Sequence, residues 1–211
     1  MKNRDNIIRY YKGTDNGALA ARLIDLADST DKGRPYAVSE FVSPGAVQIG
    51  ETVSAHAATL VLRVNGGYEG AERVKLCFIR NDYEGSVDFG LTACRITWDA
   101  RYRLLGHRDV LGALMSLGID RGRFGDIIMH EDGAVILVDT KLLPYLQQNL
   151  GKIAMVSVTI SEVPVASIPP RREKIKEIKT TVASLRLDAV VSSGFGISRT
   201  KAAEAIKGER V

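Results

Sequence analysis

The pattern of apolar residues along the first third of the chain predicts helices and one short strand. Leucine and isoleucine residues between positions 19 and 26 recur at helical spacing, and a second helix is expected to begin where Pro44 and Gly45 interrupt the pattern. The segment 59–67 (TLVLRVNGG) has the composition of a strand that a glycine pair closes. We therefore predict a small, mainly helical N-terminal domain over residues 1–70.

The middle of the chain alternates between strand-like and helix-like patterns. Strands are expected at 74–80, at 90–98, on both sides of residues 132–133 and at 154–163, and helices at 107–119 and 140–150. The Asp132-Gly133 pair is a strong signal for a tight hairpin. Allowing for one peripheral strand, this order predicts an RRM-like or ferredoxin-like sandwich over residues 71–163. The predicted fold class is α+β.

The end of the chain has a different composition from the middle. Residues 164–180 contain three prolines followed by alternating charges, which predicts a basic linker. Residues 181–211 then predict a helix, a turn and a second helix. Gly194 and Gly196 supply the backbone freedom that the turn needs, and Ser198 is a natural N-cap for the second helix.

Positive charge is concentrated in this closing part. Residues 163–211 contain ten Lys or Arg and five Asp or Glu, a net charge of +5, whereas the whole chain carries +4 and the first 162 residues therefore −1. Such an asymmetry indicates a polyanionic partner. The alternative is a solvated linker that contains several lysines.

The start of the second closing helix is a candidate phosphate site. Its N–H groups and positive dipole end favour anions, and a nearby arginine can add a bidentate contact. The predicted RNA-binding residues are Arg186, Ser198, Arg199, Thr200, Lys201, Lys207 and Arg210. Contacts of this kind give affinity with little discrimination between sequences.

This closing stretch resembles the RNA-binding domain named after ribosomal protein S-four. The matching residues are Arg186, Leu187, Asp188, Gly194, Ser198, Arg199, Ala202, Ile206 and Gly208. The resemblance implies that the Ser-Arg start of the second helix and nearby basic residues contact structured RNA. The family continues into a β-hairpin, so we expect the module to be incomplete at Val211.

The chain as a whole resembles the YlmH family of bacterial RNA-binding proteins. The resemblance rests on segments 65–74 (NGGYEGAERV) and 105–128 and on the closing module, in that order. It implies a cytoplasmic protein that docks on structured rRNA or tRNA of the large ribosomal subunit. It further implies engagement of subunits that carry peptidyl-tRNA, in ribosome-associated quality control, and a link to cell division.

Four further residues are candidates for a secondary contact with RNA or with an adjacent domain: Tyr68, Arg73, His107 and Arg108. An exposed tyrosine beside glycines would permit base stacking. The alternative for Tyr68 is packing in a turn between two strands. The alternative for His107 and Arg108 is a role at the start of a helix.

Several classes of function are disfavoured. No apolar run reaches the roughly 18 residues that span a bilayer, and the N-terminus lacks the apolar core of a secretory signal, so no membrane partner is expected. Cys77 and Cys94 lack CxxC spacing and are expected to be small buried thiols, with no disulfide, metal or other cofactor. We expect no small-molecule substrate.

An enzyme is not expected, although one enzymatic class is a genuine alternative. RNA-modifying enzymes of the pseudouridine-synthase type also carry the S-four-type module, and their catalytic motif includes an Arg-Leu-Asp. Here the Arg-Leu-Asp at 186–188 lies inside the module, where Asp188 should cap or pair locally, and Asp99, Asp109 and Asp126 are expected to be isolated turn or cap residues. A second alternative is a protein-interaction adaptor. The HRD triplet at 107–109 lacks the other protein-kinase motifs.

Overall fold

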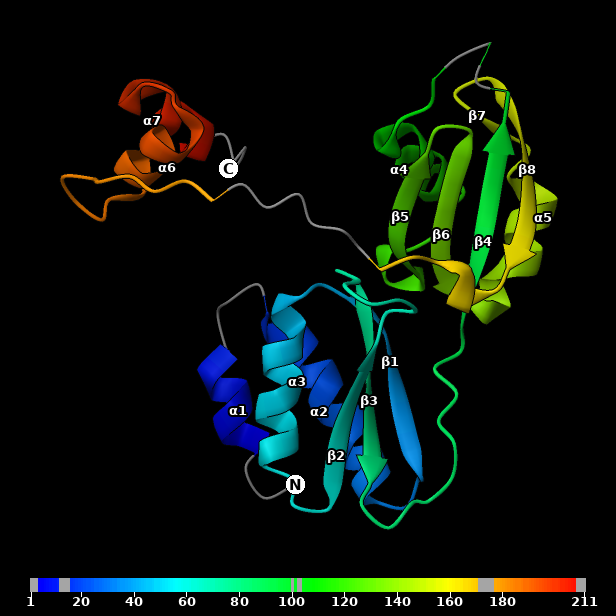
Figure 1. Cartoon of the computed structure of the whole chain (residues 1–211). Helices are drawn as coiled ribbons and strands as arrows, with labels where there is room; N and C mark the ends of the chain where they lie inside the picture. Colours follow the sequence, from blue (N-terminus) through cyan, green and yellow to red (C-terminus); the bar gives the residue numbers. More distant parts are fainter. Residues whose placement is uncertain (1–3, 12–15, 100, 102–103, 171–176, 208–211) are drawn as a thin grey trace. The chain divides into compact units, whose positions relative to one another are not determined.

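The computed structural model describes residues 4–11, 16–99, 101, 104–170 and 177–207, and it divides into two compact units, Met1–Arg171 and Arg172–Val211 (Figure 1). The first unit contains two antiparallel sheets with their own helices, and the second contains a pair of helices. Among the described residues, no helix has both the length and the apolar character needed to cross a bilayer.

Three helices and a three-stranded sheet form the first half of this unit. Its elements are α1 (Arg4–Tyr11), α2 (Gly17–Asp31), β1 (Tyr36–Val42), α3 (Gly45–Ala55), β2 (Leu60–Asn65) and β3 (Val74–Arg80). The strand order is β1-β3-β2, and both pairings are antiparallel. The helices cover one face of the sheet (Figure 1). The apolar face of α2, including Leu23 and Ile24, packs there against Leu76 and Phe78 of β3.

The predicted domain boundary at residue 71 is wrong, because it separates strand β3 from the sheet to which β3 belongs. The segment 74–80 was expected to belong to the RRM-like sandwich, but it is the central strand of the N-terminal sheet. Residues 74–79 are all buried, because β3 has a strand on each side and is covered on both faces. The N-terminal part is therefore a sheet with helices on one face, and the rest of the predicted division into four parts stays a prediction.

The segment Asn81–Gly90 crosses the face of this sheet that the helices leave open. The ring of Tyr83 lies 5.7 Å from that of Tyr36, and the backbone N–H of Asp88 donates to the Tyr36 hydroxyl. At the other end of the segment, the Lys75 ammonium donates to the carbonyls of Phe89 and Gly90, at 3.1 and 3.2 Å. The segment thus covers the sheet while it leads to the second half of the unit.

A buried ion pair joins the two sheets. The Lys75 ammonium of β3 donates to Asp139 at the end of the second sheet, and their side chains are only 5% and 12% exposed. Arg123 Nε lies 3.0 Å from the other carboxylate oxygen of Asp139. All three ammonium protons of Lys75 therefore have acceptors, as a buried cation requires.

The second sheet has the ferredoxin-like order of elements. These are β4 (Leu91–Trp98), α4 (His107–Ser116), β5 (Phe124–His130), β6 (Gly133–Asp139), α5 (Leu143–Asn149), β7 (Lys152–Ile153) and β8 (Val156–Val163). The strand order is β5-β6-β4-β8-β7, and every pairing is antiparallel. With the short β7 set aside, the chain follows β-α-β-β-α-β, so the predicted sandwich type is confirmed.

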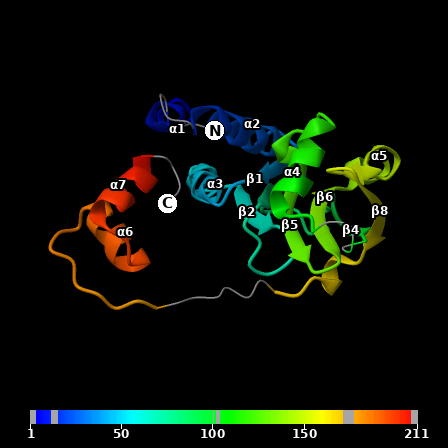
Figure 2. The same ribbon diagram turned by 90° about the horizontal axis from the view of Figure 1, so that it is seen from above.

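Both helices of this half cover the same face of its sheet (Figures 1 and 2). Alternate residues of β4, such as Cys94 and Ile96, point into the core beneath Val110 and Leu114 of α4 and Leu146 of α5. A tight hairpin joins β5 to β6 as predicted, but its two turn residues are Glu131 and Asp132, because Gly133 already pairs with His130 as the first residue of β6.

The two cysteines lie in different sheets and both are buried with free thiols. Burial raises the pKa of the Cys77 thiol to about 11 and that of Cys94 to about 12. Because the thiolate is the reactive form, both side chains behave as small apolar residues at neutral pH.

The second unit consists of α6 (Leu187–Phe195) and α7 (Arg199–Lys207). Gly196 ends α6 in the left-handed conformation, with φ of 64°, which glycine adopts at little cost. Ala189, Val191 and Ala202 are buried, and the two helices contact each other. Small residues at these positions let the two short helices approach closely.

Candidate nucleic-acid interface

One carboxylate ties the two C-terminal helices together. Arg186 Nε donates to Asp188 Oδ1 at 3.1 Å, and Arg199 Nη2 donates to Asp188 Oδ2 at 2.8 Å. These two guanidinium groups, Arg186 first, lower the pKa of the Asp188 carboxyl below its ordinary value. The predicted local pairing of Asp188 is therefore confirmed. It brings the first residues of α6 and α7 together and orients two arginines at one site.

The start of α7 has the predicted N-cap. Ser198 Oγ accepts a hydrogen bond from the Lys201 backbone N–H at 3.3 Å. Arg199, Thr200 and Lys201 form the exposed first turn of the helix. A guanidinium has five N–H donors, so the pairing of Arg199 with Asp188 leaves donors for an incoming phosphate.

Lys207 lies at the far end of α7, where it shares a groove with Arg186 and Asp188. A shallow groove of about 400 Å³ is lined by Arg186, Leu187, Asp188, Ala203, Ile206 and Lys207. Six of the seven predicted RNA-binding residues thus belong to this small unit as described. The seventh, Arg210, lies outside the described residues.

The loop between β2 and β3 docks on β5 through Asp126. The Tyr68 hydroxyl and the backbone N–H of Glu72 each donate to Asp126 Oδ2 at 2.8 Å, and the backbone N–H of Arg73 donates to Oδ1 at 3.0 Å. Tyr68 is half-buried against the apolar residues of this junction. Asp126 therefore accepts hydrogen bonds from a loop of the N-terminal sheet, and the prediction that it is isolated is wrong.

Arg73 fixes the same junction with its side chain. Its Nη2 donates to the carbonyls of Phe41 and Arg121 at 2.8 and 3.0 Å, and its Nε donates to that of Phe124 at 3.3 Å. Burial lowers the pKa of Arg73, and the nearby Asp126 only partly opposes that shift. Tyr68 and Arg73 were predicted to contact either RNA or an adjacent domain. In the structure both residues take part in the contact between the two sheets.

Arg121 belongs to this junction as well. Its guanidinium carbon lies 4.3 Å from the centre of the Phe124 ring, and its Nη1 donates to the carbonyls of Phe124 and Gly125. Burial, and then the charge of Arg73, lower the pKa of Arg121 to about 10. The hydrogen bonds of Arg73 to Phe41, Arg121 and Phe124 link the two sheets, although the burial that lowers the pKa values of both arginines disfavours their charged forms.

Replacing Asp126 with alanine is expected to lower the free energy of unfolding by about 2 kcal/mol, because three donors at the junction would lose a charged acceptor. Urea titration followed by circular dichroism measures the change. Asp120→Ala, at an exposed carboxylate nearby, should change stability by less than about 0.5 kcal/mol. Equal effects of the two substitutions would show that the loop contributes little.

His107 and Arg108 remain accessible at the start of α4. The N-cap of this helix is Gly106, whose backbone N–H donates to Asp109 Oδ2 at 2.8 Å. His107 and Arg108 are exposed. The N-terminal end of α4 is thus capped by the side chain of Asp109 and not by His107 or Arg108. Their contact with RNA stays a prediction.

The sheet face opposite α4 and α5 is partly covered. Phe41 and Ile168 pack there against Ala93, Val135 and Leu137. Further along, Arg95 Nη2 lies 2.8 Å from Asp132 Oδ1. Residues 85–167 contain eight Lys or Arg and nine Asp or Glu, a net charge of −1. This half therefore lacks the net positive charge that would make it a strong RNA-binding surface by itself.

The fold and the basic helix pair together define an α+β protein in which a ferredoxin-like domain precedes a small cationic unit. Residues 85–167 match the protein-family model described as "Putative RNA-binding domain in YlmH". The chain is similar to the Ribosome-associated protein quality control protein P2 of Bacillus subtilis (strain 168), with 28% identity over 171 residues. That match covers 81% of this chain and 66% of the relative's length, so the chain spans just under two thirds of the relative.

A solved structure has the same fold. The cell division protein ylmH from Streptococcus pneumoniae superposes with a TM-score of 0.61 and 22% identity, over 72% of this chain and 93% of that one. The matched family segment begins at residue 85, whereas the predicted sandwich was expected to begin at 71. This difference agrees with the position of β3 in the N-terminal sheet.

Proposed function

We propose that this chain is a non-catalytic RNA-binding protein that docks on structured RNA through its C-terminal helix pair, the beginning of an S-four-type module. The observation that carries the proposal is the cluster of Arg186, Arg199 and Lys201 around the Ser198-capped start of α7. Fixed cations at a helix N-terminus suit phosphate groups. Because residues 85–167 carry a net charge of −1, most of the electrostatic attraction for RNA would come from the C-terminal helix pair.

The proposed RNA is rRNA or tRNA on the large ribosomal subunit, and the proposed role is ribosome-associated quality control in the cytoplasm. Two observations support it: the family description of residues 85–167 names an RNA-binding domain, and the name of the Bacillus relative places that protein in ribosome-associated quality control. The name of the Streptococcus protein adds a link to cell division. His107 and Arg108, exposed on the ferredoxin-like half, are proposed as secondary contacts.

The test is binding to purified large ribosomal subunits, with and without bound tRNA, over a series of salt concentrations. We expect affinity to fall steeply with salt, because phosphate contacts release counterions. The Arg199→Ala/Lys201→Ala variant should bind weakly and lose about two units of the logarithmic salt slope. Lys141→Ala/Lys152→Ala removes the same charge from exposed sites of the ferredoxin-like half and should bind almost normally.

Two outcomes would contradict the proposal. Binding that neither salt nor the double substitution in α7 changes would exclude docking through phosphates at this site. Equal losses in the two double variants would show that only total charge matters and that the capped helix start has no special role.

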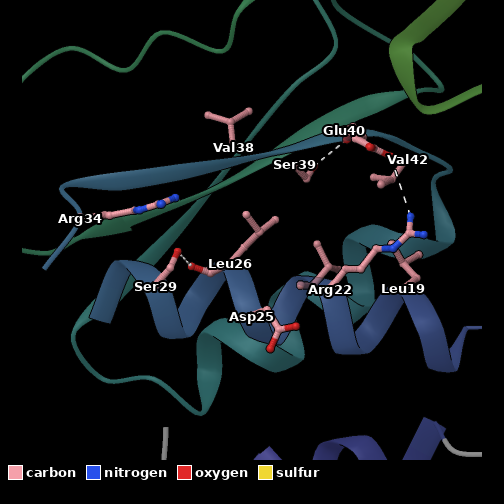
Figure 3. Close-up of a pocket in the computed structure, with 11 residues that line it drawn as sticks. Leu19, Arg22, Asp25, Leu26, Ser29, Arg34, Val38, Ser39, Glu40 and Val42 are labelled. Atoms are coloured by element: carbon pink, nitrogen blue, oxygen red, sulfur yellow. Dashed lines mark hydrogen bonds and ion pairs between the residues drawn. The ribbon is translucent and has the colours of Figure 1, made fainter. Parts of the chain in front are cut away.

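A second candidate function, a protein-interaction adaptor, is favoured by a groove between α2 and β1 (Figure 3). The groove measures about 410 Å³, and apolar side chains such as Leu19, Leu26 and Val42 line it beside an edge strand. Edge strands accept extended peptides by backbone hydrogen bonding. Ribosome binding that persists at high salt and is lost on Leu26→Asp would favour this candidate over RNA docking.

A further inference from the structure

A groove on the N-terminal half of the first unit has an unusual set of side chains. Helices α1 and α3 each pack against α2, and a groove of about 430 Å³ runs between them. Its lining consists of Ile7, Tyr10, Tyr11, Gln48, Thr52 and His56. None of these six residues is acidic, so the lining itself carries no negative charge.

Tyr10 supplies a flat apolar surface at the mouth of this groove. It is 78% exposed, although large aromatic side chains usually lie mostly buried. Its ring meets that of Tyr11 edge to face, with centroids 4.9 Å apart and planes at 88°. Tyr11 is the one ring contact of Tyr10 among the described residues, and most of the Tyr10 surface stays open. An exposed, positioned ring of this kind suits stacking by a nucleobase.

The opposite wall of the groove offers hydrogen-bonding groups whose roles can be assigned. His56 Nδ1 lies 2.7 Å from the carbonyl oxygen of Thr52. Because a carbonyl can only accept, Nδ1 is the donor of this hydrogen bond, and Nε2 is the second hydrogen-bonding atom of the ring. The exposed amide of Gln48, two turns earlier on α3, provides both a donor and an acceptor.

We infer that this groove binds an unpaired purine base of an RNA strand, which stacks on Tyr10 and is read by Gln48 and His56. A glutamine amide pairs with adenine through two hydrogen bonds, and a purine offers the larger stacking surface. The inference rests on the proposed RNA-binding function and adds a second, base-contacting site to it. The C-terminal helix pair would hold phosphates, and the groove would select single-stranded purine segments.

The experiment compares two RNA probes, a fluorescent oligoadenylate and a fully paired RNA hairpin, on the full chain. Tyr10→Ala should weaken oligoadenylate binding about tenfold, and Gln48→Ala should weaken it less. Tyr10→Phe keeps the ring and should bind almost normally. Tyr145→Ala removes a partly exposed tyrosine from α5 and serves as the matched control, which should also bind normally. All four variants should bind the hairpin as the unaltered chain does.

Each other outcome has a definite meaning. Unchanged oligoadenylate affinity in Tyr10→Ala, or an equal loss of affinity in Tyr145→Ala, overturns the inference that the groove binds a purine base. If hairpin binding still depends on Arg199 and Lys201 in that case, the proposed function stays intact. A second outcome is loss of oligoadenylate binding in Tyr10→Ala together with hairpin binding that does not change when Arg199 and Lys201 are replaced. It supports base binding in the groove and contradicts docking through the C-terminal helix pair. Failure of the unaltered chain to bind either probe overturns both.

Discussion

Asp139→Ala is expected to lower the free energy of unfolding by about 3 to 5 kcal/mol, which is the usual effect of removing one member of a buried ion pair. The Lys75 ammonium would keep its two backbone acceptors but lose the Asp139 carboxylate, and Arg123 would lose its ion pair with the same residue. Asp132→Ala provides the control. It removes a similar contact to Arg95, but that pair is 36% and 69% exposed, so the loss should stay below about 1 kcal/mol.

A double substitution separates the charge from the packing. Lys75→Met/Asp139→Leu removes both charges and keeps apolar volume, so it should recover much of the stability that Asp139→Ala loses. Urea denaturation of the four proteins gives the comparison. Similar small losses for Asp139→Ala and Asp132→Ala would mean that water reaches Lys75 once its carboxylate is gone, which would contradict the burial described above.

Gly133→Ala is expected to destabilise the ferredoxin-like half by about 3 kcal/mol or more, since overpacking against a rigid backbone has few ways to relax. A Cβ atom at this position would overlap the carbonyl oxygen of Ile96 on the neighbouring strand. Strand β6 pairs on one side with β4 and on the other with β5, so a shift that relieves the overlap disturbs both pairings. Urea denaturation followed by circular dichroism is again the measurement.

The matched control for this substitution is Gly112→Ala. Apart from the backbone of its own helix α4 and its chain neighbours, no atom of the described chain lies within 4 Å of a Cβ at position 112. Alanine is the better helix former, so this variant should gain about 0.5 to 1 kcal/mol. Opposite signs for the two substitutions are the expected result. A mild effect of Gly133→Ala would show that β4 and β6 can separate locally at low cost.

Local patterns made much of this fold predictable. The presence of a hairpin between β5 and β6, the Ser198 cap and the order of helices and strands between residues 90 and 163 all follow from interactions over a few residues. The pairing of Asp188 was foreseeable for the same reason, because Arg186 lies two positions away. The residues of the candidate phosphate site therefore come together as the sequence indicated, and both phosphate binding and the RNA partner stay predictions.

The errors arose where contacts join distant parts of the sequence. The pattern of 74–80 correctly indicated a strand, but alternation of residue types does not say which sheet a strand enters. Asp126 accepts hydrogen bonds from residues more than fifty positions earlier, and Lys75 pairs with a residue 64 positions later. One signal was available: a lysine in the otherwise apolar VKLCFIR requires a carboxylate, because a buried ammonium needs acceptors.

The order of the strands in the N-terminal sheet has a consequence for the growing chain during translation. Strands β1 and β2 are made first, but each pairs only with β3, which lies between them. Until Arg80 has left the ribosomal exit tunnel, neither strand has its native partner. The open face of the sheet stays uncovered until Gly90 has followed. The N-terminal sheet therefore cannot complete its strand pairing before β3 has emerged, and the connecting segment that covers its open face arrives only afterwards.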